Sequence, residues 1–269
     1  MEELINKIHN KDNIEMMKQL GDKSIDLVVT SPPYDDIRDY HGFSWDIDLV
    51  ISELNRVLKD GGVVAWVVGD RVKNHNKSLT SFRQAIKFQE AGFNVYEHLI
   101  YEKAGSSPPV KNRYQNNFES IFIFSKGKPK TVNLIEDKEN KWAGNRGFGK
   151  KGIRNKDGTI SERKRTAVKE FGRRTTIWRY TNTFGYSTVD KEAHQHPAIF
   201  PEKLALDLIN SYSNEGDTVL DIFSGSGTTA KVCMLNKRDF IACELSEEYY
   251  KLSLSRLDKY RGVEDVQTL

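Results

Sequence analysis

Short apolar segments rich in β-branched residues alternate with segments of helical periodicity along most of the chain. Residues 45–59 show the helical pattern, because their apolar positions recur three and four residues apart. Strands that alternate with helices favour a parallel sheet whose two faces are both covered by helices. We therefore predict an α/β fold. The predicted strands are residues 24–30, 63–69, 93–103, 119–126, 217–223 and 239–244, and the predicted helices are residues 45–59, 78–91, 201–212, 227–236 and 246–259.

The size and composition suit one large domain or a domain with an insertion. The chain has 269 residues, of which 38% are hydrophobic and 29% are charged. Its longest apolar runs, such as residues 62–69, are too short to cross a bilayer, and the first ten residues show no secretion signal. Cys233 and Cys243 provide no disulfide framework and predict two buried thiols in a reducing compartment. We expect a cytoplasmic protein without a membrane partner.

One segment interrupts the alternation and carries an excess of positive charge. Residues 127–174 are rich in Lys, Gly and Asn and show no convincing period, which is typical of an insertion. Residues 126–175 hold 16 Lys or Arg and 6 Asp or Glu, a net charge of +10, whereas the rest of the chain holds 25 basic and 32 acidic residues. By its charge alone, this segment predicts either a polyanionic partner or a solvated loop.

A glycine-rich turn follows the strand predicted at residues 217–223. Gly225 and Gly227 can adopt positive φ angles and let a ligand approach the backbone closely. Glu244 ends the next predicted strand, where a carboxylate can bind both hydroxyls of a ribose. The pattern predicts a cofactor that contains a nucleoside. Gly225, Gly227 and Ala230 also fit the G-x-G-x-x-A pattern of a nicotinamide cofactor site, so this turn alone leaves the cofactor open.

Two consecutive prolines follow the strand predicted at residues 24–30, in the sequence Ser31-Pro32-Pro33-Tyr34. The prolines remove two backbone donors and fix two φ angles, so this turn is stiff. A second Ser-Pro-Pro at residues 107–109 lacks an aromatic successor, and we interpret it as a loop. The first turn therefore joins a hydroxyl and a fixed carbonyl to an aromatic ring.

Three motifs in this order resemble those of the beta-class amino-methylating DNA methyltransferases, which use S-adenosyl-L-methionine. Their [D/N/S]-P-P-[Y/F/W] motif matches residues 31–34, their H-P-A-x-F-P motif matches residues 196–201, and their D-x-F-x-G-x-G motif matches residues 221–227. The resemblance implies a Rossmann-like class I methyltransferase fold with a seven-stranded, mostly parallel and circularly reordered sheet. The implied domains are a catalytic half at residues 1–126, an inserted target-recognition region at residues 127–180 and a cofactor-binding half at residues 181–269.

The resemblance also implies roles for individual residues. The implied catalytic residues are Ser31, Pro32, Pro33 and Tyr34. The implied cofactor-binding residues are Asp12, Ala198, Phe200, Pro201, Asp221, Phe223, Gly225, Ser226, Gly227, Thr228, Glu244 and Leu245. In the basic segment, the predicted DNA contacts are Arg163, Lys164, Arg165, Arg173 and Arg174. His194 and His196 lack the other ligands that a metal site requires, so no metal is expected.

The catalytic motif suits methyl transfer to an exocyclic amine. The lone pair of such an amine is drawn into the aromatic ring, and acceptors for its N–H groups pull it toward tetrahedral geometry. The Ser31 hydroxyl and the Pro32 carbonyl are such acceptors, and the prolines hold the carbonyl still. Tyr34 offers a face on which a flipped base can stack. In the resembled family, Ser-Pro-Pro-Tyr is associated with cytosine N4 and Asp-Pro-Pro-Tyr with adenine N6.

We predict a site-specific DNA methyltransferase that acts on cytosine N4, with adenine N6 as the alternative. A methyltransferase of protein glutamine or of RNA is a further alternative, but the serine, the motif order and the basic segment count against it. A nicotinamide dehydrogenase leaves the double proline unexplained, and a non-catalytic nucleic-acid-binding module needs no cofactor loop. The expected partners are double-stranded DNA and a cognate restriction endonuclease, and the protein is expected to be a monomer or a homodimer.

Overall fold

The computed structural model describes residues 2–33, 45–105, 111–146, 152–162, 166–181 and 187–261. The chain divides into two compact units. The larger unit combines residues 1–133 with residues 176–269, and the smaller unit is residues 134–175. The alternating strands and helices therefore belong to one unit, although the smaller unit separates them in the sequence.

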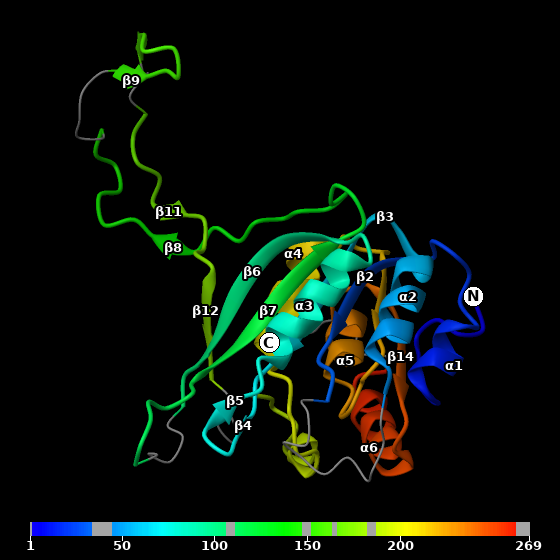
Figure 1. Ribbon diagram of the computed structural model, residues 1–269. Coiled ribbons are helices and arrows are strands. Elements are labelled where there is room, and N and C mark those ends of the chain that lie inside the picture. Colours follow the sequence, from blue (N-terminus) through cyan, green and yellow to red (C-terminus); the bar gives the residue numbers. More distant parts are fainter. Residues whose placement is uncertain are drawn as a thin grey trace. The chain divides into compact units, whose positions relative to one another are not determined.

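An eight-stranded sheet forms the centre of the larger unit (Figure 1). Its strands are β1 (Lys7–Asn10), β2 (Ile25–Thr30), β3 (Leu58–Val68), β6 (Asn94–Lys103), β7 (Phe118–Ser125), β12 (Ile177–Tyr180), β13 (Thr218–Asp221) and β14 (Asp239–Glu244). In the described part of the chain, their order is β1-β14-β13-β2-β3-β7-β6-β12. β7 runs antiparallel to β3 and β6, and the other neighbouring pairs are parallel. The carboxyl ends of β14, β13, β2 and β6 therefore share one edge with the amino end of β7.

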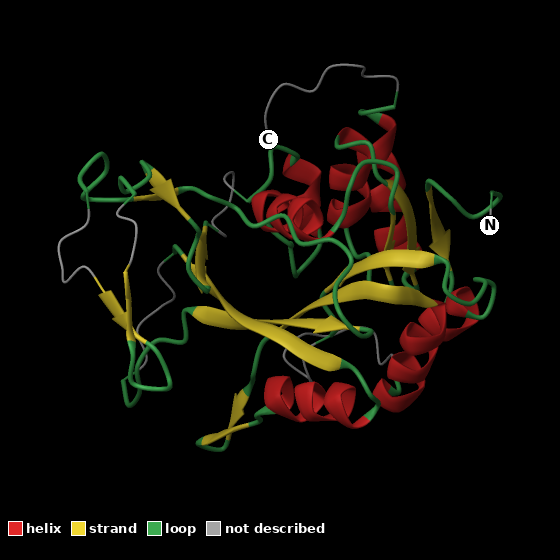
Figure 2. Cartoon of the chain, turned by 90° about the horizontal axis from the view of Figure 1, so that it is seen from above, coloured by secondary structure: helices red, strands yellow, loops and turns green. Residues whose placement is uncertain are grey.

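Helices cover both faces of this sheet (Figure 2). They are α1 (Asn13–Met17), α2 (Ile47–Val57), α3 (Thr80–Glu90), α4 (Glu202–Tyr212), α5 (Thr228–Leu235) and α6 (Glu247–Asp258). α2 begins where the Asp46 side chain accepts hydrogen bonds from the backbone N–H groups of Asp48 and Leu49, and it buries Val50 and Leu54. A hairpin of β4 (Val72–Lys73) and β5 (Asn76–Lys77) stands apart from the sheet. No helix in the described ranges is both long and apolar enough to cross a membrane.

The core of the larger unit extends to the carboxyl edge of the sheet. Trp66 of β3 is fully buried, and its indole N–H donates to Gln84 Oε1 at 2.8 Å. Its ring contacts Phe88, which stacks on Phe124 with 4.1 Å between the ring centroids. The ring centroid of Phe223, which follows β13, lies 6.4 Å from that of Trp66. This aromatic packing fixes Phe223, the residue directly before the glycine-rich turn.

The predicted α/β fold is confirmed, and three details differ from the predictions. The described sheet has one strand more than the resemblance implied. β1 and β12 were not predicted as strands; β1 is short and buries only Ile8, and β12 pairs with β6. β3 begins at Leu58, directly after α2, rather than at residue 63. The reason is that Gly61, at φ +79°, continues the strand and donates its N–H to Lys126 O at 2.7 Å.

In the described residues of the smaller unit, all strands are short. β8 (Lys138–Glu139) pairs with β11 (Phe171–Gly172), and β9 (Gly152–Arg154) pairs with β10 (Ile160–Glu162), both antiparallel. Strands of two or three residues are too short to produce a recognisable period, which explains why the sequence shows none.

Candidate active site

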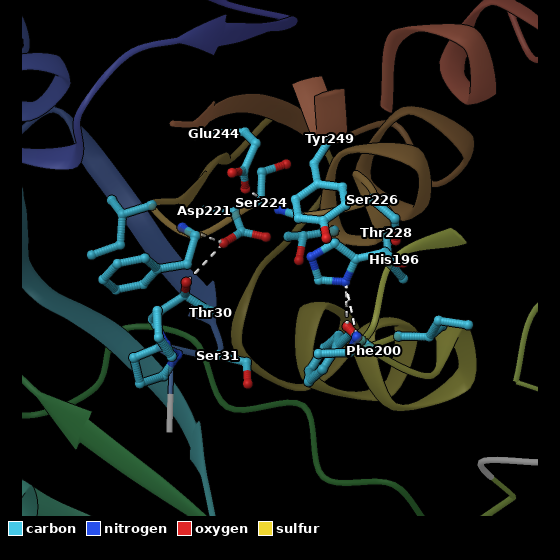
Figure 3. Close-up of a pocket in the computed structure, with 18 of the residues that line it drawn as sticks. Thr30, Ser31, His196, Phe200, Asp221, Ser224, Ser226, Thr228, Glu244 and Tyr249 are labelled. Carbon is cyan, nitrogen blue, oxygen red and sulfur yellow. Dashed lines mark hydrogen bonds between the residues drawn. The ribbon is translucent and has the colours of Figure 1, made fainter. Parts of the chain in front are cut away.

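A cavity of about 420 Å³ opens at the carboxyl edge of the sheet, within the larger unit (Figure 3). The turn after β2, the turn after β13 and the end of β14 all contribute to its wall. The predicted site residues that line it are Asp12, Ser31, Pro32, Pro33, Ala198, Phe200, Pro201, Asp221, Phe223, Gly225, Ser226, Thr228, Glu244 and Leu245. Gly227 is not among the lining residues, and Tyr34 lies outside the described residues.

The glycine-rich turn needs glycine at two positions. Gly225 has φ +51°, and a Cβ atom there would lie 2.9 Å from His196 Nε2. Gly227 has φ +77°, precedes the first residue of α5, and would place a Cβ atom 2.9 Å from Ser253 Cβ. Both the backbone conformation and the close neighbours therefore exclude larger side chains. Gly225 lines the cavity, whereas Gly227 is next to Ser253 of α6.

Asp221 ends β13 and connects the glycine-rich turn to the catalytic motif. Its carboxylate accepts a hydrogen bond from the Thr30 hydroxyl at 2.7 Å (Figure 3). It also accepts one from the Phe223 N–H at 3.1 Å. Thr30 is the residue directly before Ser31, so this contact holds the two motifs together. Burial raises the pKa of the Asp221 carboxyl to about 6, although both hydrogen bonds oppose the rise.

Glu244 is anchored at the end of β14 by two backbone groups. Its Oε2 accepts the Gly225 N–H at 2.8 Å, and its Oε1 accepts the Ser246 N–H at 2.9 Å. The pKa of this carboxyl is raised above its ordinary value, because burial outweighs the backbone hydrogen bonds that lower it. Each oxygen keeps a further lone pair for a ligand hydroxyl. The carboxylate is therefore oriented before any ligand arrives.

Replacing Asp221 by asparagine is expected to change how stability depends on pH. An aspartate in an unfolded chain titrates near about 3.9. Between that pH and about 6, the folded protein retains a proton that the unfolded chain has lost. The contribution of Asp221 to the free energy of unfolding is therefore complete below about pH 4 and is lost as the pH rises through 6. Relative to wild type, Asp221→Asn should gain on the order of 3 kcal/mol between pH 4 and pH 7.5.

Urea denaturation of both proteins across this pH range measures the difference. Asp258→Asn is a matched control, because Asp258 is exposed at the end of α6, where it pairs with Arg261. The control should change the free energy of unfolding by less than about 1 kcal/mol, because an exposed ion pair contributes little. A pH-independent difference for Asp221→Asn would contradict the raised pKa.

The strap of residues 187–201 contributes His194 and residues 196–201 to the cavity wall. It includes a 3-10 helix, η1 (Lys191–Gln195), followed by the His-Pro-Ala segment. The His196 ring contacts Tyr249 edge-on with 4.4 Å between centroids, and its Nδ1 lies 2.9 Å from Ala198 O. His196 is thus held in place by Tyr249 and Ala198, and its ring packs beside Gly225. Within the described ranges, no three His, Cys, Asp or Glu side chains are grouped to hold a metal ion.

A buried ionic cluster behind the glycine-rich turn was missed by the sequence analysis. Arg256 donates to Asp190 Oδ2 at 3.1 Å and to Glu202 Oε1 at 3.0 Å, and Lys231 Nζ lies 2.9 Å and 2.8 Å from the same two atoms. Arg256 Nη1 also donates to Ser226 O at 2.5 Å. All four charged side chains are at least 95% buried. The cluster therefore joins α4, α5, α6, the strap and the glycine-rich turn.

A signal for part of this cluster was present in the sequence. Lys231 is surrounded by apolar residues in the helix predicted at residues 227–236. An exposed lysine usually lies on the polar face of an amphipathic helix, so this pattern indicated a buried lysine. Buried charges require partners. The partners come from segments 29 to 66 residues away, so periodicity could not identify them.

The predicted DNA contacts fall in the smaller unit. Arg163, Lys164 and Arg165 lie outside the described residues. Arg173 is exposed, and the Arg174 guanidinium donates to both carboxylate oxygens of Asp137, at 3.1 Å and 3.0 Å for its Nε. Arg174 is therefore engaged within its own unit.

The cavity has the features that a nucleoside-containing cofactor requires. Its volume lies within the range of about 300–1,000 Å³ that is usual for ligand sites. The Ser224 hydroxyl at its wall is buried and has no hydrogen-bond partner among the described residues, so it is available to a ligand. Glu244 supplies oriented acceptors, and Gly225 allows a close approach to the backbone. The residues present therefore fit S-adenosyl-L-methionine.

Comparisons with known proteins agree in family and fold. The family model N6_N4_Mtase, described as DNA methylase, matches residues 25–255. The chain is 52% identical over 246 residues to the orphan methyltransferase M.BamHII of Bacillus amyloliquefaciens, which covers 91% of this chain and 93% of that protein. The solved PvuII DNA methyltransferase, named as cytosine-N4-specific, matches with a TM-score of 0.68 at 20% identity, over 97% of this chain and 88% of that chain. The M1.HpyAVI–SAM complex matches with a TM-score of 0.60 at 22% identity, over 93% and 98% of the two chains.

Proposed function

Because the chain belongs to the N6_N4_Mtase family of DNA methylases, we propose that it transfers a methyl group from S-adenosyl-L-methionine to N4 of a flipped cytosine in double-stranded DNA. DNA methylation is the activity of the family, and the choice of base and the roles of individual residues are the proposal. The observation that carries it is one cavity lined by both the Ser31-Pro32-Pro33 turn and the glycine-rich turn with Glu244.

The catalytic turn holds the target amine. The Ser31 hydroxyl and the Pro32 carbonyl accept its two N–H groups and favour the pyramidal nitrogen that attacks the methyl carbon. The hydrogen bond between Thr30 and Asp221 ties this turn to the cofactor loop at 2.7 Å, which limits the reorganisation needed on reaction. When bound, S-adenosyl-L-methionine supplies an electrophilic methyl group on a sulfonium ion. We propose that Tyr34, on sequence grounds, stacks on the base.

The cofactor contacts follow from the cavity wall. Glu244 accepts hydrogen bonds from the ribose hydroxyls through the lone pairs that Gly225 and Ser246 leave open. Asp12 caps α1 through the N–H groups of Ile14 and Glu15, and it contributes to the cavity wall. Leu245 supplies an apolar contact for the adenine, and Ala198 and Phe200 supply apolar contacts for the methionine part.

The basic segment is proposed to bind the DNA backbone. Residues 126–175 carry a net charge of +10, and lysine and arginine side chains replace the counterions of phosphates. The proposed contacts are Arg163, Lys164, Arg165, Arg173 and Arg174. Of these, Arg174 also pairs with Asp137. This segment keeps its predicted role in target recognition, and a cognate restriction endonuclease stays a prediction.

Adenine N6 is the alternative target, because its amine needs the same two acceptors. Ser31 favours cytosine by the association of Ser-Pro-Pro-Tyr with cytosine N4. The PvuII enzyme, whose fold this chain shares, is named as cytosine-N4-specific, which supports the same choice for this chain.

The proposal is tested by expressing the protein in cells whose DNA is otherwise unmethylated. Mass spectrometry of the nucleosides should detect 4-methylcytosine, and modification mapping should place it in one sequence context. Ser31→Ala should lower the single-turnover methylation rate by about 100-fold, because one amine N–H loses its acceptor. Its affinity for S-adenosyl-L-methionine, measured by calorimetry, should stay at the wild-type level. A product of 6-methyladenine would favour the alternative base, and wild-type turnover by Ser31→Ala would contradict the assigned turn.

A further inference from the structure

Three polar side chains occupy a part of the cavity that the proposed cofactor contacts do not use. They are Tyr101 and Lys103 of β6 and Glu119 of β7. Tyr101 lies directly opposite Glu119 in the antiparallel register, and Lys103 follows two residues after Tyr101. Residues two apart in a strand and residues directly opposite across a pair point to the same face, so all three side chains project together.

The sheet topology places this cluster at the same edge as the catalytic turn. β6 runs in the same direction as β2, so the carboxyl ends of both strands meet the cavity, together with the amino end of β7. Three inter-strand spacings separate β2 from β6, which corresponds to roughly 14 Å. A base whose amine is held at Ser31 can span much of this gap, and the long side chain of Lys103 can reach its opposite side. The cluster therefore faces the position expected of the base rather than that of the cofactor.

The cluster presents two hydrogen-bond donors. Lys103 Nζ forms an ion pair with Glu119 Oε1 and lies 6.0 Å from the Tyr101 ring centroid, and its ammonium keeps further N–H groups. The Tyr101 side chain is only 3% exposed, and no described residue forms a hydrogen bond with its hydroxyl. Burial, together with the negative charge of Glu119, raises the pKa of this hydroxyl, which therefore stays protonated as a donor. Because Tyr101 lines the cavity, this donor is available to an acceptor atom of a ligand.

Two donors fit cytosine better than adenine. Beside its amine, the Watson–Crick edge of cytosine carries two acceptors, N3 and O2. The same edge of adenine carries one acceptor, N1, followed by an apolar C2–H. A donor facing C2–H would remain unpaired, and a site built for hydrogen bonds rejects a ligand that leaves them unmade. Enzymes that flip a base commonly read this edge.

We infer that Tyr101 and Lys103, the latter held by Glu119, form a recognition subsite that donates hydrogen bonds to N3 and O2 of the flipped cytosine. The inference rests on the proposed function, because it requires a flipped base with its amine at Ser31. A purely structural role is the competing explanation, since a cross-strand ion pair also joins β6 to β7. A structural role affects folding, whereas a recognition role affects the response to the acceptors of the base.

The test uses single-turnover methylation of a synthetic duplex that carries the mapped site, with either cytosine or 3-deazacytosine at the target position. 3-Deazacytosine replaces N3 by C–H and keeps both the amine and O2. Wild type is expected to methylate it at least about 10-fold more slowly than cytosine. Tyr101→Phe and Lys103→Met are each expected to lower the rate on cytosine by about 10- to 100-fold. 3-Deazacytosine has no acceptor at position 3. The variant that lacks the donor to N3 should therefore methylate 3-deazacytosine as fast as it methylates cytosine, within about twofold.

Three further measurements separate recognition from folding. Lys103→Arg retains a charged donor and should recover most of the activity lost in Lys103→Met. Lys77→Met is the matched control, because Lys77 lies over the ring of Phe118, the first residue of β7, but does not line the cavity. The affinity for S-adenosyl-L-methionine, measured by calorimetry, should not change in any of these variants. Tyr101→Phe removes a single hydroxyl and preserves the ring packing, so the test does not depend on the lysine variants folding.

The outcomes distinguish this inference from the proposed function. If wild type produces 4-methylcytosine but is indifferent to 3-deazacytosine, or if both variants retain the wild-type ratio of the two rates, the recognition subsite is wrong and the function stands. If wild type produces 6-methyladenine, the choice of cytosine and the subsite are both overturned. A loss of the 3-deazacytosine penalty in one variant, with intact cofactor binding, supports the subsite.

Discussion

Glu244→Gln is expected to weaken binding of S-adenosyl-L-methionine by about 10- to 100-fold. In wild type, both carboxylate oxygens are held by backbone N–H groups, Gly225 at 2.8 Å and Ser246 at 2.9 Å. A glutamine must turn its NH₂ group toward one of these donors, so one hydrogen bond becomes a repulsion. The ribose also loses a charged acceptor, and hydrogen bonds to charged groups contribute about 1.5–3 kcal/mol each. Isothermal titration calorimetry measures the dissociation constant directly.

Glu247→Gln controls for the change in charge. Glu247 begins α6, is exposed, and pairs with Lys251 at 2.7 Å, three residues along the chain from Glu244. The substitution removes the same charge without touching the cavity, so the dissociation constant should stay within about twofold of wild type. If a folded Glu244→Gln protein also stayed within that limit, the ribose contact would have to be abandoned.

Arg256→Met is expected to lower the free energy of unfolding by about 3–5 kcal/mol, because it leaves a buried charge uncompensated. In wild type, two cations and two carboxylates balance within the cluster of Lys231, Arg256, Asp190 and Glu202. Removing Arg256 leaves an excess negative charge at positions that are about 95% buried. It also removes the donor to the Ser226 carbonyl in the glycine-rich turn. Chemical denaturation at neutral pH measures the loss.

Two further variants test whether the loss comes from the buried charge. Lys251→Met lies on the same helix but breaks only an ion pair whose two side chains are 69% and 70% exposed, and it should cost less than about 1 kcal/mol. Adding Glu202→Gln to Arg256→Met restores the charge balance and should recover part of the loss. A loss for Arg256→Met no larger than that for Lys251→Met would show that the cluster contributes little to stability.

Most of the fold could be predicted because hydrophobic periodicity is a local property. The strand ending at Thr30 and the helix burying Val50 and Leu54 are recognisable from the spacing of apolar residues, and the structure places both within a few residues of their predicted bounds. β1 and β12 were not predicted, because the sequence pattern of a four-residue strand that buries one or two side chains differs little from that of a loop. β3 begins at Leu58 rather than at residue 63, because the backbone of Gly61 continues the strand through a hydrogen bond to Lys126.

The candidate site divides in the same way. By itself, the sequence determined the α/β architecture, the stiff Ser31-Pro32-Pro33 turn and the glycine-rich turn before α5, because prolines, glycines and strand ends act on the backbone next to them. Only the tertiary structure decided that Thr30 bonds to Asp221, that Arg256 supports the glycine-rich turn, and that Lys103 faces the same cavity as Ser31. Hydrogen bonds and ion pairs between distant segments depend on which strands become neighbours in the sheet, and residue spacing carries no record of that order.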